Sequence, residues 1–206
     1  PREVAELAGA LASGAVEKAQ VVAVKRLLAD GGSSSVAIAL DGAEAVVACA
    51  ANSPAEEARS ACLRCRVLEA TASAVGAARG LTLEVLLELL QLYRLIVEGS
   101  LAVDDSSDAA LEGVPVLRVA VLEFLGSDAR PPARSDTVEL GKNAVEVLQL
   151  ILAGLPESLR ATCPAVSDFE RLRLRVSLAL RLLRVGALQQ KVAAIVDLAE
   201  CAAVLK

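Results

Sequence analysis

The sequence predicts an all-α fold assembled from repeated helical units, and three observations lead to this prediction. First, 55% of the 206 residues are apolar but only two are Phe, one is Tyr and none is Trp. A core of Ala, Leu and Val suits closely packed helices. Second, apolar residues recur at the 3.6-residue helical spacing, and no segment shows the sustained alternation of a strand. Third, the 13 Gly and 7 Pro stand between apolar segments and do not cluster in a linker.

The first 30 residues read as two helices. Residues 2–14 place Val4, Leu7 and Leu11 on one face, and Gly14 is expected to end this helix. Residues 15–30 form a longer amphipathic helix that closes at Asp30-Gly31-Gly32. This pair is predicted to be the end of a preceding repeat.

Residues 31–73 contain the most regular unit of the chain. Two short segments, 31–42 and 43–53, precede a long helix predicted over 54–73. Pro54 suits the first helical position, and two glutamates follow it in the first turn. Because the helix that ends near Asp30 and the helix that ends near Ser73 close 43 positions apart, the pattern favours a repeat.

The remaining segments continue this pattern less regularly. The helix over 81–99 is apolar nearly all round, which predicts burial on more than one face. The helix that begins at Ser167 or Asp168 has a clear N-cap signal. The other expected segments are a degenerate helix at 74–80, an acidic loop at 101–108, helices within 109–126, a Pro-rich loop at 127–136, a long helix at 137–154 and a terminal helix at 187–205.

The short-short-long plan, the segment VAIALDGA and the Ser-Pro break at residues 53–54 resemble the armadillo family. The repeat period of that family is about 40–47 residues. The resemblance implies an armadillo-like right-handed α-solenoid of about four degenerate repeats in one domain, 1–206. Its parts are a partial repeat at 1–30, the best repeat at 31–73, degenerate repeats at 74–154 and C-terminal helices at 155–206. In style, the chain is closest to the armadillo regions of plant U-box ubiquitin ligases.

Catalysis and metal binding are not expected. The chain has no His, which removes the commonest general base, and no Gly-rich phosphate-binding loop. Cys62 and Cys65 form a C-x-x-C pair inside a helical pattern, where both are expected to be small core residues. We therefore predict that the protein is no enzyme, needs no cofactor, and keeps its five thiols free of metal.

Charge and hydropathy predict which kinds of partner the protein does not bind. The net charge of −5 is spread evenly along the chain and shows no basic footprint for nucleic acid. The longest uncharged run spans only residues 45–55, which predicts no membrane insertion. With free thiols and no signal sequence at the first residue, a cytoplasmic or nuclear location is expected. The oligomeric state stays open.

These observations favour a non-catalytic protein–protein interaction scaffold, one form of which is the substrate-recognition region of a larger ubiquitin-ligase-type protein. One alternative is an engineered or purely structural helical-repeat or bundle protein with no natural partner, which the absence of Met and His would suit. Another is a helical bundle that binds an apolar ligand in its Leu-rich middle.

A partner is expected on the long helices 15–30, 54–73, 136–153 and 168–185, if these stand parallel along one side of the stack. Side chains there that packing does not need are mostly basic, so an acidic protein or peptide segment is the expected partner. The candidate partner-binding residues are Lys18, Lys25, Arg59, Arg66, Glu146, Arg173, Arg181 and Arg184.

Overall fold

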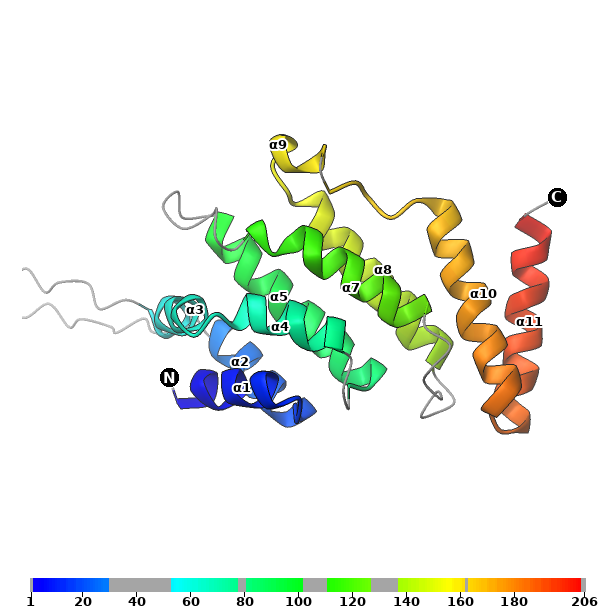
Figure 1. Cartoon of the computed structure of the whole chain (residues 1–206), viewed down its shortest axis with the longest axis horizontal. Helices are drawn as coiled ribbons and strands as arrows, with labels where there is room; N and C mark the ends of the chain where they lie inside the picture. The colour runs from blue at the N-terminus through cyan, green and yellow to red at the C-terminus, as the bar shows by residue number, and fades with distance from the viewer. Residues whose placement is uncertain are drawn as a thin grey trace, which may run out of the picture.

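The computed structural model describes residues 2–29, 53–77, 81–101, 111–126, 137–161 and 163–204, and all regular structure in these ranges is helical (Figure 1). The all-α prediction is confirmed for this part of the chain. The predicted segment 31–42, all of the predicted segment 43–53 except Ser53, most of the acidic loop and the loop 127–136 lie outside it. The helices are α1 (Arg2–Ser13), α2 (Lys18–Ala29), α3 (Pro54–Arg64), α4 (Val67–Ala77), α5 (Leu83–Leu101), α7 (Val114–Gly126), α8 (Thr137–Ala153), α9 (Glu157–Arg160), α10 (Asp168–Val185) and α11 (Leu188–Val204).

The main helices lie in two neighbouring rows (Figure 1). One row runs α1, α4, α7, α10, and each helix contacts the next. The other runs α2, α5, α8 in the same manner, and α10 packs on both α7 and α8. Helix α11 packs mainly on α10 and lies at the opposite end of the molecule from α1 (Figure 1).

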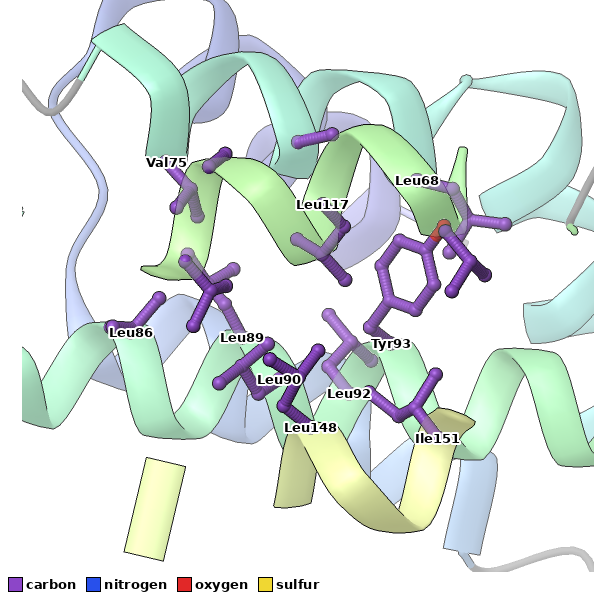
Figure 2. Close-up of a cluster of buried hydrophobic side chains, with 14 of the residues drawn as sticks. Leu68, Val75, Leu86, Leu89, Leu90, Leu92, Tyr93, Leu117, Leu148 and Ile151 are labelled. Carbon is purple, nitrogen blue, oxygen red and sulfur yellow. The ribbon is translucent and has the colours of Figure 1, made fainter. Parts of the chain in front are cut away.

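Helix α5 supplies the centre of the hydrophobic core, as its all-round apolar sequence predicts. Side chains on several of its faces are fully buried, and Leu89, Leu92 and Ile96 are among them. They pack with Leu117 from α7 and with the α8 side chains Leu148 and Ile151 (Figure 2). A helix that is apolar all round is stable only when neighbours cover it on several sides, and α2, α3, α4 and α8 all contact α5 here.

Tyr93 is the largest side chain in this core and lies within it almost completely (Figure 2). Its hydroxyl lies so close to Gly113 that a Cβ on that residue would come within 2.9 Å of the hydroxyl oxygen. The absence of a side chain at Gly113, just before α7, therefore leaves room for the Tyr93 hydroxyl.

Several helix ends follow the local sequence signals. Ser53 and Ser167 cap α3 and α10, each in a capping box with the glutamate three residues later. Pro54 occupies the first turn of α3, as predicted. Gly14 follows α1 with a φ of 73°, a conformation that glycine adopts without steric cost.

The prediction of one long helix over 54–73 is wrong. Helix α3 ends at Arg64, Arg66 adopts a left-handed φ of 51°, and α4 begins at Val67. Ser73 lies inside α4, so the 43-residue recurrence does not mark equivalent helix ends. No Gly or Pro signals this break, because it is the packing of α3 on α2 and of α4 on α1 and α7 that separates the two helices.

Among the described helices, none is long and apolar enough to cross a bilayer.

Candidate functional site

The surface expected from the four long helices is not assembled as predicted. Helix α5, and not segment 54–73, lies between α2 and α8. Helix α10 belongs to the other row, where it follows α7 and also contacts α8. The candidate residues on these helices therefore fall on different parts of the molecule.

The two candidate lysines of α2 tie that helix to α5. The Lys25 ammonium lies 2.6 Å from the Glu88 carboxylate and also donates to the side-chain oxygen of Gln91. Lys18 lies 3.6 Å from the same carboxylate. Lys25 and Glu88 are both mostly buried, so this cluster contributes to helix packing.

Arg59 and Arg66 occupy two unrelated settings. The Arg59 guanidinium lies across Gly99 of α5, where a Cβ would collide with it. Arg66 is exposed at the break between α3 and α4, beside a hollow of about 640 Å³ between α1 and α4. That hollow is lined mainly by Ala, Ser and Gly and also contains Cys65.

The three candidate arginines of α10 do not share one surface. Arg181 is only 5% exposed and donates to the backbone carbonyl of Leu125 at 3.1 Å. The expectation that packing does not need Arg181 is therefore wrong. Arg173 and Arg184 are exposed, and Arg173 borders a hollow of about 300 Å³ with Glu170 and Leu122.

A third hollow, a groove, lies between α8 and α10, and Glu146 is the one candidate residue that lines it. Its volume is about 490 Å³. The apolar lining is Val145, Leu150, Ala153, Leu174 and Leu178, with Gly141 at one end, and the polar lining is Lys142, Glu146, Gln149, Arg171 and Arg175. We call this feature the α8–α10 groove.

The two walls of the α8–α10 groove are held at both ends. At the Gly141 end, Leu178 of α10 occupies the space that a Cβ on Gly141 would fill. At the other end, the Gln149 side chain accepts a hydrogen bond of 2.7 Å from the backbone N–H of Val166, just before α10. Glycine therefore permits close helix contact at one end while an amide fixes the spacing at the other.

A buried carboxylate from α11 fixes two of the charges in the groove. Asp197 is 6% exposed and accepts from Lys142 at 3.0 Å and from Arg175, which also lies 2.9 Å from Glu200. Burial opposes ionisation, yet the hydrogen bonds from Arg175 and Lys142 hold the pKa of Asp197 below its ordinary value. The hydrogen bond to Asp197 raises the pKa of Arg175 in turn.

Arg171 and Glu146 are the groove charges left for a ligand. Both are exposed, and neither forms an ion pair with another residue in the described ranges. They stand on opposite walls, Arg171 on α10 and Glu146 on α8. The groove thus combines an apolar floor with one free charge of each sign.

Sequence reasoning missed most of this groove. Arg171 and Arg175 lie four residues apart and so share one side of a helix, but nothing in the sequence links them to Asp197 and Lys142. Their partners lie 22 or more positions away, and no local pattern predicts a pair that only folding brings together.

The cysteines are only partly as predicted. Cys62 is buried, and burial raises the pKa of its thiol to about 12. Cys65 is exposed at the end of α3, so the prediction that both residues are core residues on one helix face is wrong for Cys65. Cys163 and Cys201 are buried free thiols, and Cys49 lies outside the described residues. Within the described ranges, no three acidic or Cys side chains gather as metal ligands.

The comparisons with known proteins do not link this geometry to a family. The chain matches no family model, no curated protein and no solved structure.

Proposed function

We propose that this chain is a non-catalytic protein–protein interaction scaffold and that the α8–α10 groove is its partner-binding surface. The observation that carries the proposal is an open apolar groove with oriented charges on both walls. Peptide-binding grooves commonly combine an apolar floor for anchoring side chains with a few polar groups that set direction.

An armadillo-like helical repeat remains our proposal for the architecture, in a register different from the one expected. Helices α4 and α5 form one layer and α7 and α8 the next, and each layer contacts its neighbour. Helices α3, α4 and α5 follow one another over residues 53–101, and α9, α10 and α11 over residues 157–204, which supports a unit of three helices. Layers that contact only their neighbours are typical of solenoids.

The charges of the groove define the partner more closely than an acidic segment alone. Lys142 and Arg175 are occupied by Asp197, which leaves Arg171 and Glu146 for the partner. We infer a short segment with one or two apolar anchors over Leu150 and Leu174. It would place a carboxylate towards Arg171 and a cation towards Glu146.

The test is a selection of peptides from a randomised display library against the folded chain, followed by anisotropy measurements of affinity. Selected peptides should lose at least about tenfold in affinity against Leu150→Glu and against Arg171→Glu. The loss with Arg171→Glu should shrink as salt rises, since screening acts over about 8–10 Å. Val119→Glu, which changes an exposed apolar residue on α7, is the matched control and should bind as wild type does.

Two results would reject this site. Either no peptide is enriched, or the enriched peptides bind the Leu150→Glu variant as well as the wild type. The first result would favour a purely structural chain. Replacement of the candidate residues Arg173, Arg181 and Arg184 by Glu together would be a poor test, because Glu at position 181 would place an uncompensated negative charge in a buried site.

Binding of an apolar ligand in the Leu-rich middle has less support. The side chains of α5 pack against one another and against their neighbours there (Figure 2). Recognition of substrates for a larger ubiquitin-ligase-type protein is a narrower form of the scaffold proposal. A natural parent protein that carries a ligase module beside this sequence would support it.

A further inference from the structure

The outer face of α11 is a continuous apolar surface. We define it by Leu188, Val192, Ile195, Val196, Ala199 and Ala203, all of which are exposed. At 100° per residue these six positions fall within about 100° of the helix circumference. The buried side of α11, with Ala194 and Cys201, lies opposite and faces the rest of the molecule.

No other described helix covers this face. Helix α11 packs mainly on α10 and lies at the end of the described structure opposite α1 (Figure 1). Val192 is 55% and Ile195 57% exposed, although both would ordinarily be buried. A contiguous apolar stripe of this kind marks an interaction surface more often than isolated exposed apolar residues do.

We propose that the outer face of α11 packs against the same face of a second copy of this chain, with the two helices antiparallel about a two-fold axis. The first argument is steric. An axis between Ile195 and Val196 sets Leu188 opposite Ala203 and Val192 opposite Ala199 of the other copy. Large side chains then meet small ones towards both ends of the contact, and Ile195 meets Val196 at its centre; alternation of large and small residues allows facing helices to interdigitate.

A parallel arrangement lacks this fit. It would place Leu188 against Leu188 and Ala199 against Ala199 of the other copy. The large pair would hold the helices apart while the small pair left a void, and voids at an interface lose contact energy.

The charges at the edges do not oppose the antiparallel arrangement. Lys191 lies on one edge of the face and Glu200 on the other, each about 90° from the stripe centre. Two-fold symmetry brings like edges together, with Glu200 beside Gln189 of the other copy. Each like-charged pair is offset by nine residues, or about 14 Å along the helix, so repulsion is screened.

The area sets the expected strength. A helix of 17 residues is about 25 Å long and about 10 Å across, so the contact footprint is about 250 Å² per copy. Standard stable interfaces bury about 800 Å² per partner. The dimer should therefore be weak and reversible, and dilution should dissociate it.

The experiment is sedimentation velocity of the full chain at concentrations up to about 0.5 mM, where weak dimers are populated. Wild type should self-associate, and Val192→Glu and Ala199→Lys should each weaken association at least tenfold. An equimolar mixture of these two variants should recover dimer, because the register sets position 192 opposite position 199. Val119→Glu, at a residue 50% exposed on α7, should associate as wild type does.

Circular dichroism and a thermal melt establish that each variant is folded. Both altered side chains are exposed, so little loss of stability is expected. If Val192→Glu is nevertheless unstable, Ala199→Lys alone tests the interface. A wild type that stays monomeric over the full concentration range overturns the proposal. So does a dimer that both single variants leave intact, or a mixture that recovers nothing. Monomers that instead bind phosphatidylcholine vesicles through Val192 would assign the face to a lipid surface and overturn the second-copy proposal. The α8–α10 groove is unaltered in all these variants, so peptide binding there is a separate result.

Discussion

At the scale of single residues, Asp197 is the most informative side chain in the structure. It joins α11 to Lys142 of α8 and Arg175 of α10, and it is nearly inaccessible to solvent. Breaking a buried ion pair by removal of one partner is strongly destabilising, because the remaining charge is left without compensation. Asp197 therefore stabilises the last layer and also orients two side chains of the α8–α10 groove.

Asp197→Asn should lower the free energy of unfolding at pH 7 by about 2–3 kcal/mol, less than the roughly 3–5 kcal/mol typical of fully buried pairs. The smaller figure reflects the partial exposure of Lys142 and Arg175. Since the pKa of Asp197 is lower when folded, its contribution is complete above the ordinary value of 3.8 and is lost as pH falls below it. Urea unfolding at pH 7 and pH 3 measures this.

The matched control for this measurement is Glu146→Gln, an exposed change on α8 that should be nearly neutral at both pH values. A gap between wild type and Asp197→Asn that is as large at pH 3 as at pH 7 would show that the charge of Asp197 is not the cause.

The thiols provide a second prediction at this scale. Cys65 is exposed, whereas burial raises the pKa values of Cys62, Cys163 and Cys201. In the native protein, iodoacetamide should label Cys65 at least about 100-fold faster than these three, as peptide mass spectrometry would show. Cys65→Ser should remove the fast labelling among these four positions. Comparable rates at Cys62 and Cys65 would mean that the helix break is not present.

At the scale of elements, the break between α3 and α4 shapes the N-terminal half. Arg66 takes a left-handed conformation that residues other than Gly, Asn and Asp seldom adopt. This one residue redirects the chain so that α3 contacts α2 while α4 contacts α1 and α7.

Arg66→Gly should therefore raise the free energy of unfolding by about 0.5–1 kcal/mol, because relief of strain exceeds the added entropy of the unfolded chain. Glu69→Gly, at an exposed helical position three residues later, should instead lower stability by about 0.5–1 kcal/mol. Thermal denaturation of both variants gives the comparison. If the two changes lower stability equally, residue 66 is helical in solution, and the prediction of one helix over 54–73 would be correct.

At the scale of the whole molecule, stability is distributed unevenly along the stack. The main hydrophobic cluster extends from α1 to α10, whereas Ala179, Leu182 and Ala194 form a separate small cluster between α10 and α11. Structures built of successive layers can open from one end, because each layer depends mainly on its neighbour.

Amide hydrogen exchange should therefore be slowest in α5 and at least about tenfold faster in α11. Leu182→Ala should accelerate exchange in α11 and leave α5 nearly unchanged. Leu86→Ala, an equally buried residue of α5, should destabilise the molecule globally by about 2–5 kcal/mol. Equal loss of protection in α5 from both variants would show that the molecule unfolds as one cooperative unit.

The sequence by itself determined what depends on local chemistry. Helical periodicity, the Ser167 cap, the proline start at Pro54 and the burial of the 81–99 helix could all be predicted, because each depends on residues within a few turns of one another. The site was predicted less well from the sequence than the helices were. Of the eight candidate residues, only Glu146 lines the α8–α10 groove.

Only the tertiary structure decided the rest. It broke the helix at Arg66, buried Arg181 against the Leu125 carbonyl, and paired Asp197 with Lys142 and Arg175. None of these has a local signature, since each arises where helices far apart in sequence must share space and neutralise buried charge. Helical periodicity states which face of a helix is apolar, but it does not state which helix covers that face, and that choice placed the groove between α8 and α10.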